Sequence, residues 1–161
     1  MRSVLFVCTG NICRSPTAEG ILRKRVAESG LAELIVVDSA GTHGYHVGQP
    51  PDARTQAAAL RRGYDLSRLR ARRVAPEDFQ RFDLLLAMDR EHERLLGRLA
   101  PPATGHKIGL VMSYARRSVH DEVPDPYYGG PGGFELVLDL LEDAAEGLLE
   151  HLRRELSPAG R

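Results

Sequence analysis

Residues 4–18 read V-L-F-V-C-T-G-N-I-C-R-S-P-T-A, and this stretch decides how the 161-residue chain folds. Four apolar residues from Val4 to Val7 indicate a short buried strand, and a polar loop follows from Cys8 to Arg14. Pro16 then suits the first turn of a helix. A strand, a tight loop and a helix in this order are typical of α/β proteins, which bind ligands at the carboxyl ends of parallel strands.

The rest of the chain repeats this alternation. Further apolar runs of strand length lie at residues 34–37, 84–87 and 108–112, and they are continuous, as expected for strands buried on both faces. Helical patterns lie at residues 16–29, 52–62, near 76, 89–96 and 134–156. We therefore predict one α/β domain over residues 1–161, with a short polar tail at 157–161. Its core is a four-stranded parallel twisted sheet flanked by helices, in the flavodoxin-like order 2-1-3-4.

Composition narrows the possible partners. The chain has 22 basic and 22 acidic side chains, so bulk charge indicates neither nucleic-acid binding nor attraction to an anionic membrane. No apolar run approaches the ~20 residues of a membrane helix, and the N-terminus lacks the pattern of a signal peptide. Both cysteines lie in one loop, which argues against a disulfide framework and favours the cytoplasm. A mid-chain arginine cluster is either solvated surface or an attraction for an anionic substrate; it comprises Arg61, Arg62, Arg68, Arg70, Arg72 and Arg73.

The loop from Cys8 to Arg14 has the features of an anion cradle. Five residues separate the two, a spacing that lets one turn of backbone wrap a tetrahedral oxyanion. Main-chain N–H groups from Thr9 onward can turn inward, and the helix that follows adds its positive dipole end. Gly10 and Asn11 tolerate the left-handed conformations that a tight cradle requires. The planar guanidinium of Arg14 matches two phosphoryl oxygens.

A cysteine at this position is predicted to be a nucleophile. Cationic surroundings at a helix N-terminus favour the thiolate of Cys8. Ser15 either caps the helix or donates its hydroxyl to that sulfur. A buried inert cysteine is the simpler interpretation of a lone match. However, the strand before and the helix after Cys8 favour phosphate chemistry, and the spacing to Cys13 does not fit the usual zinc or redox pair.

Over nearly its whole length the chain resembles the low-molecular-weight protein tyrosine phosphatase family. The resemblance rests on V-C-T-G-N-I-C-R-S-P-T-A-E at 7–19, D-S-A-G-T at 38–42, P-P-D at 50–52, F-D-L-L-L-A-M-D at 82–89 and D-P-Y-Y-G at 125–129. It implies hydrolysis of phosphotyrosine through a phosphocysteine intermediate, without metal or other cofactor. Phosphotyrosine-containing proteins would be the partners, with no nucleic acid or membrane involved. We expect a cytoplasmic monomer or weak homodimer.

The resemblance also assigns roles to individual residues. Cys8 would attack phosphorus, Arg14 would bind the phosphoryl oxygens and Asp125 would be the general acid, whereas Asp121 and Glu122 look like surface charges. The remaining expected substrate-binding residues are Thr9, Gly10, Asn11, Ile12, Cys13 and Ser15 in the loop, with Tyr45, Tyr127 and Tyr128 as pocket walls. Ser39 is expected to support the loop through a bond to Asn11.

Two positions leave questions open. Leu69 stands where the family often has a histidine bonded to the loop asparagine, so the network around Asn11 is either reduced or rebuilt. Cys13 either packs the loop or protects Cys8 by forming a disulfide with it, as the inner cysteine does in related enzymes.

Three other activities fit parts of the pattern. Some relatives act on phosphoarginine and tend to carry threonine at the position of Ile12, so the apolar residue favours an aryl ester. Arsenate reductases on this scaffold use further downstream cysteines, and none follows Cys13. A silent phosphate-binding or redox module would not need Cys8, Arg14 and Asp125 together.

Overall fold

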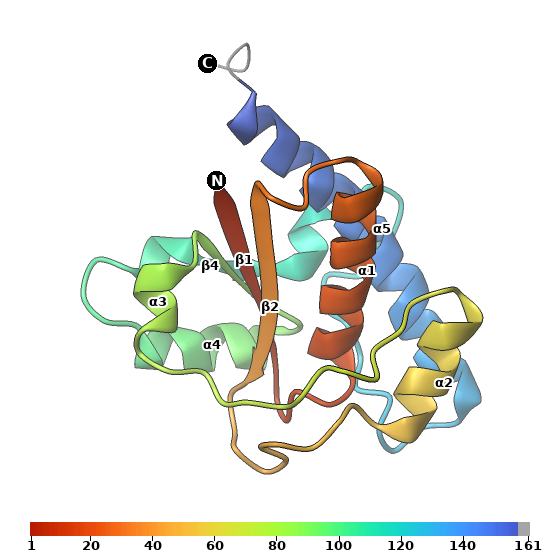
Figure 1. Ribbon diagram of the computed structural model, residues 1–161. Helices are drawn as coiled ribbons and strands as arrows, with labels where there is room; N and C mark the ends of the chain where they lie inside the picture. Colours follow the sequence, from red (N-terminus) through yellow and green to blue (C-terminus); the bar gives the residue numbers. More distant parts are fainter. Residues whose placement is uncertain (158–161) are drawn as a thin grey trace.

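The computed structural model describes residues 1–157 and arranges them around a parallel β-sheet (Figure 1). Its strands are β1 (Arg2–Cys8), β2 (Ile35–Gly41), β3 (Leu84–Ala87) and β4 (Ile108–Leu110). They lie in the order β2-β1-β3-β4, and every neighbouring pair is parallel. The predicted order 2-1-3-4 is therefore confirmed.

The register brings the carboxyl ends of the strands to one edge of the sheet. Cys8 at the end of β1 pairs with Gly41 at the end of β2. On the other side Val7 pairs with Ala87, which in turn pairs with Leu110 at the end of β4. The loops that leave the four strands therefore meet at this edge, where α/β sheets bind their ligands.

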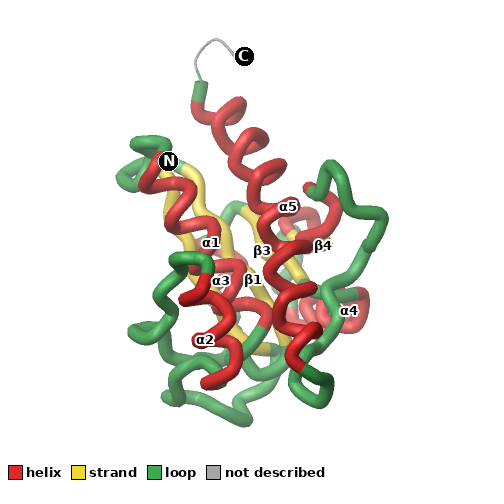
Figure 2. Tube along the Cα trace, turned by 90° about the vertical axis from the view of Figure 1, so that its right-hand side faces the viewer, coloured by secondary structure: helices red, strands yellow, loops and turns green. Residues whose placement is uncertain are grey.

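Helices cover both faces of the sheet (Figures 1 and 2). One face carries α1 (Arg14–Glu28) and the long α5 (Pro131–Leu156), with α2 (Ala53–Arg61) packed beside α5. The opposite face carries α3 (Asp78–Arg81) and α4 (Arg90–Leu99). No helix among residues 1–157 is both long and apolar enough to cross a membrane.

Side chains of the central strand β1 pack into two separate apolar cores, one on each face of the sheet. Val4 and Phe6 of β1 belong to the core under α1 and α5. Leu5 and Val7 point the other way and pack with residues such as Phe79 under α3 and α4. Since β1 is buried on both faces, Cys8 follows a rigid strand, and its position is fixed with little freedom.

The second strand is longer than predicted, because it continues through D-S-A-G to Gly41. In the structure Asp38 accepts hydrogen bonds from Arg72, and Ser39 donates one to Glu19, so both polar side chains are satisfied within the sheet.

Other boundaries also differ. The fourth strand ends at Leu110, and the apolar residues that follow it form a 3₁₀ turn, η2 (Val111–Tyr114). A shorter 3₁₀ turn, η1 (Gly105–Lys107), comes directly before this strand. Helix α5 begins at Pro131, three residues before the predicted start, because proline suits the first turn of a helix. The predicted polar tail lies outside the described residues from 158 onward.

Candidate active site

The loop between β1 and α1 is held from its outer side. Three of its carbonyl oxygens accept main-chain N–H groups from the loops after β2. These bonds are Thr42 to Cys8 at 2.8 Å, His43 to Thr9 at 3.0 Å and Asp52 to Ile12 at 2.9 Å. With these carbonyl groups engaged outside, the amide groups of the loop are available to a ligand on the inside.

Two glycines permit the close packing around this loop. Asn11 has a φ of 59°, so its predicted left-handed conformation is confirmed. The same prediction for Gly10 is wrong, because its φ is not positive. A Cβ at Gly10 would lie 2.8 Å from Cδ2 of His46, so a larger residue there would displace the His46 side chain. A Cβ at Gly41 would lie 2.7 Å from the carbonyl oxygen of Thr9, and because that oxygen is part of the main chain, glycine is required there.

Above the loop lies an open cavity of about 370 Å³. It is lined by Cys8, Thr9, Gly10, Ile12, Cys13, Arg14, Tyr45, His46, Asp125, Tyr127 and Tyr128. Segments from three strand ends therefore supply its walls, and the three predicted catalytic residues face the same space. Asn11 and Ser15, predicted to bind substrate, are not among the lining residues.

Cys8 is buried, with its Sγ 2.9 Å from Oγ of Ser15. Ser15 lies inside α1 rather than at its N-cap, and no side chain caps that helix. The amide of Asn11 donates to the same Oγ at 2.8 Å, so that oxygen is already an acceptor. The hydroxyl hydrogen of Ser15 can therefore point to sulfur, which stabilises a thiolate.

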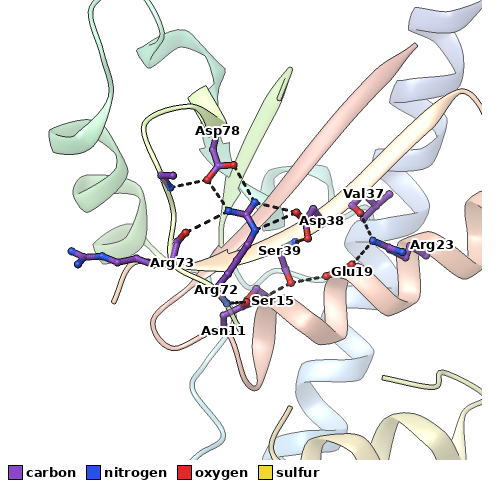
Figure 3. Close-up of polar contacts among 11 residues, drawn as sticks. Asn11, Ser15, Glu19, Arg23, Val37, Asp38, Ser39, Arg72, Arg73 and Asp78 are labelled. Carbon is purple, nitrogen blue, oxygen red and sulfur yellow. Dashed lines mark hydrogen bonds and ion pairs between the residues drawn. The ribbon is translucent and has the colours of Figure 1, made fainter. Parts of the chain in front are cut away.

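The support of Asn11 continues into a buried polar chain (Figure 3). Asn11 donates to Ser39 at 2.9 Å, as predicted, and Ser39 donates to Glu19 at 2.7 Å. Burial raises the pKa of Glu19, while the hydrogen bond from Ser39 and the charge of Arg23 oppose that effect. The chain of hydrogen bonds thus links Cys8, through Ser15, to a buried carboxyl group on α1.

Leu69 does not weaken this network. Its side chain packs against the apolar core instead. The main-chain N–H of Arg72 donates to Oδ1 of Asn11 at 3.0 Å, while the guanidinium of Arg72 bridges Asp38 and Asp78 (Figure 3). The network is therefore rebuilt on a main-chain donor that a fixed ion pair holds in place.

Arg14 is buried and oriented by two acceptors. Its Nη1 donates to Oδ2 of Asp89 and to the carbonyl oxygen of Val123, each at 3.0 Å. Its Nη2 lies 3.7 Å from Oδ2 of Asp125. Burial opposes ionisation of Asp89, but hydrogen bonds from His92 and Arg14 and their charges lower its pKa overall. A fixed guanidinium of this kind can grip an anion without reorganising.

Asp125 lies at the rim of the cavity with its side chain about half exposed. Its Oδ1 accepts the main-chain N–H of Tyr127 at 3.0 Å, which closes the turn. The neighbouring carboxylates face elsewhere, because Asp121 and Glu122 both bind Arg90 at the start of α4. Of these three acids, only Asp125 lines the cavity beside Cys8.

Aromatic side chains form the outer walls. Tyr127 and Tyr128 meet edge to face at 4.9 Å between ring centroids, and Tyr128 is 92 % exposed. Tyr45 stands opposite, stacked on His43 at 5.0 Å. Such a rim can sandwich a flat aryl group.

Cys13 also lines the cavity, but its chemistry differs from that of a nucleophile. Burial raises the pKa of its thiol to about 12, although the neighbouring hydroxyl group of Thr55 opposes the shift. Cys13 therefore rests as a thiol, and both cysteines are free in the structure.

Four residues of this site were not predicted from the sequence. Asp89 and His92 follow β3, and the carboxyl end of a predicted strand could have pointed to Asp89. His46, in the loop after β2, also lines the cavity. Glu19 lies within the quoted loop motif, but nothing in the pattern indicated a buried acid.

Three arginines of the mid-chain cluster form ion pairs with carboxylates of other elements. Arg61 and Arg62 bind Glu135 on α5, and Arg72 binds Asp38 and Asp78. Half of the six arginines therefore tie elements together, which supports neither a simple solvated surface nor a general attraction for anions.

A family model described as low molecular weight phosphotyrosine protein phosphatase matches residues 3–158. The chain belongs to this phosphatase family. Its members include a low molecular weight protein-tyrosine-phosphatase of Streptomyces coelicolor, 47 % identical, covering 95 % of this chain and 94 % of the relative. The human low molecular weight phosphotyrosine protein phosphatase is 42 % identical, over 92 % of this chain and 94 % of that protein.

Solved structures agree with the family assignment. The protein tyrosine phosphatase of Entamoeba histolytica superposes with a TM-score of 0.93 at 41 % identity, covering 96 % of this chain and 99 % of that one. The phosphatase family is therefore matched over the sheet, the helices and the loops that form the cavity, and the chain is a hydrolase of the protein-tyrosine-phosphatase type.

Proposed function

We propose that the chain hydrolyses phosphotyrosine in proteins, with Cys8, Arg14 and Asp125 as the catalytic residues. The observation that carries the proposal is their shared cavity, in which the sulfur of Cys8 lies against the Ser15 hydroxyl and the guanidinium of Arg14 is fixed by Asp89. These groups supply a nucleophile, an anion grip and a proton donor.

In the first step the thiolate of Cys8 attacks phosphorus in line with the departing phenolic oxygen. A sulfur–phosphorus bond forms as the phosphorus–oxygen bond breaks, and Asp125 transfers its proton to the leaving oxygen. Arg14 and the inward-facing amide groups bind the three equatorial oxygens throughout.

In the second step water replaces sulfur. Asp125, now a carboxylate, takes a proton from the water as its oxygen attacks phosphorus. The sulfur–phosphorus bond breaks, inorganic phosphate leaves and the thiolate of Cys8 is restored. No metal ion is required in this scheme, because Arg14 and the amide dipoles carry the stabilising charge.

An aryl phosphate is the substrate class that the walls favour. Ile12 presents an apolar side chain to the cavity, and the aromatic rings of Tyr45, Tyr127 and Tyr128 surround its mouth. A phosphoarginine side chain would bring a guanidinium against the apolar side chain of Ile12, which offers it no hydrogen bond. Competing phosphotyrosine and phosphoarginine peptides would decide, and a preference for arginine would overturn this part of the proposal.

The partners are phosphotyrosine-containing proteins, and we place the protein in the cytoplasm as a monomer or weak homodimer. Free cysteines in the cavity support a reducing compartment. Sedimentation velocity across a range of protein concentrations tests the oligomeric state.

The central test is turnover of p-nitrophenyl phosphate in the presence of EDTA. Cys8→Ser is expected to abolish turnover while leaving the fold intact, and activity that persists in this variant would refute the mechanism. Asp125→Asn is expected to lower kcat by about 10²–10³-fold. Asp121→Asn is its matched control, because that carboxylate binds Arg90 on the surface.

A further inference from the structure

A buried histidine contacts the loop between β1 and α1 from the face of the sheet that carries α3 and α4. His92 is the third residue of α4 and is only 2 % exposed. Its Nε2 lies 2.7 Å from the hydroxyl oxygen of Thr9, the residue that follows the nucleophile. The contact therefore joins the first residue of the loop to a helix outside it.

The other ring nitrogen faces the carboxylate that orients Arg14. Nδ1 of His92 lies 3.1 Å from Oδ1 of Asp89 without a hydrogen bond of good geometry. The same oxygen accepts the main-chain N–H of His92 at 2.9 Å, so a main-chain hydrogen bond joins the two residues. The second oxygen of Asp89 accepts from Arg14 at 3.0 Å. A continuous polar path thus runs from Thr9 through His92 and Asp89 to Arg14.

This path connects the two ends of one loop. Thr9 begins the loop and Arg14 ends it, and the path between them passes outside the loop through the start of α4. A loop that is closed in this way cannot change the distance between its first amide group and its guanidinium without breaking a buried contact.

The imidazole is neutral in these surroundings. Burial lowers the pKa of His92 to about 4, and the positive charge of Arg14 lowers it further. The charges of Asp89 and Asp125 oppose this shift, whereas His43 adds to it slightly. A neutral ring has one donor and one acceptor nitrogen. Nε2 and the hydroxyl group of Thr9 therefore share one hydrogen bond, which either atom can donate, and this contact fixes the rotamer of Thr9.

We propose that His92 is a positioning residue, which holds Thr9 and Arg14 at the separation that fits a bound phosphoryl group. The proposal rests on the phosphatase function assigned to this cavity. His92 itself does not line the cavity, so it acts on phosphate only through its two neighbours. A histidine that merely filled the core would affect stability and leave phosphate affinity untouched.

The test measures inorganic phosphate binding by calorimetry on folded variants, together with kcat and KM for p-nitrophenyl phosphate. Thr9→Val removes the hydroxyl at constant shape, and His92→Asn keeps a polar group near Asp89 but does not reach Thr9. Each is expected to raise the Kd for phosphate about tenfold, as expected from loss of one buried hydrogen bond. The double variant should lose little more than either single change, because both remove the same contact.

Two further variants make the test specific. Thr9→Ser retains the hydroxyl and is expected to bind phosphate more tightly than Thr9→Val. His106→Asn, at an exposed position on η1, is expected to bind phosphate like the wild type. If His92→Asn does not fold, the Thr9→Val and Thr9→Ser pair decides alone.

The outcomes separate this proposal from the catalytic one. Variants that lose thermal stability but keep the wild-type Kd and kcat/KM would overturn the positioning role, as would fully additive losses in the double variant. If the wild type binds phosphate but turns over no ester, the catalytic proposal fails, and the Kd values still test His92.

Discussion

Asn11 offers the sharpest test of how the loop is held. Its side chain makes three buried hydrogen bonds, to Ser15, Ser39 and the main-chain N–H of Arg72, at 2.8, 2.9 and 3.0 Å. Its backbone is left-handed, with a φ of 59°. Asn11→Ala removes all three bonds and places a Cβ-bearing residue without a polar side chain in that conformation.

The expected loss of stability follows from these contacts. Three buried hydrogen bonds at about 1 kcal/mol each contribute about 3 kcal/mol. The left-handed conformation costs alanine about 1 kcal/mol more than asparagine or glycine. Asn11→Ala should therefore lower the free energy of unfolding by about 4 kcal/mol, a large share of the stability of a domain of this size.

Urea unfolding gives the stability, and p-nitrophenyl phosphate turnover gives the activity. We expect kcat/KM to fall about tenfold, because the Ser15 hydroxyl loses the donor that orients it toward Cys8. Asn11→Gly is the matched variant: it loses the same bonds but relieves the backbone, so it should be about 1 kcal/mol more stable than Asn11→Ala.

Two results would contradict this reasoning. A loss below about 1 kcal/mol in Asn11→Ala would mean that the hydrogen bonds do not stabilise the loop. Equal stability of the alanine and glycine variants would mean that the left-handed backbone carries no strain.

Three further predictions concern separate features. His92→Gln should make the free energy of unfolding less sensitive to acid, because the pKa of His92 is about 4 in the folded protein and about 6.5 in the unfolded chain. The contribution of His92 to stability is therefore full above pH 6.5 and falls toward pH 4, by up to about 3 kcal/mol more in the wild type than in the variant. Urea unfolding at several pH values measures this difference. If Cys13 protects Cys8, its thiolate attacks the sulfenic acid that peroxide forms on Cys8, and a disulfide forms as hydroxide leaves. Because burial raises the pKa of Cys13 to about 12, the thiolate fraction, and with it the rate of disulfide formation, should rise about tenfold per pH unit. Mass spectrometry should find no such disulfide in Cys13→Ser. Gly41→Ala should lower the free energy of unfolding by about 2 kcal/mol, because its Cβ would overlap a carbonyl group of the loop. Gly97→Ala, which has open space around it on α4, should raise that free energy by about 0.5–1 kcal/mol. Equal shifts of the two melting temperatures would refute the steric argument.

Local sequence patterns predicted where the loop of the site lies in the fold and which residues it contains. An apolar run before Cys8 and a helix after it place the loop at the end of a strand, since a continuous apolar segment is stable only when the strand is buried on both faces. The spacing from Cys8 to Arg14 is a property of neighbours in the chain, so it was visible without the fold. The motif around Asp125 could be recognised for the same reason.

The partners that hold these groups could not be predicted locally. Asp89 and His92 reach the loop only because β3 lies beside β1, and Glu19 supports Asn11 only through Ser39 on β2. Leu69 shows the limit most clearly: a missing side chain looked like a weakened network, yet a main-chain N–H takes its place.

The sequence by itself determined the fold class and predicted which chemical groups would meet a phosphoryl group, because these groups lie within one short loop and one short motif. Only the tertiary structure decided what orients them. The orienting groups lie up to 109 residues away along the chain, as between Arg14 and Val123. Contacts over such separations depend on strand order and register, which fix positions that no local pattern encodes.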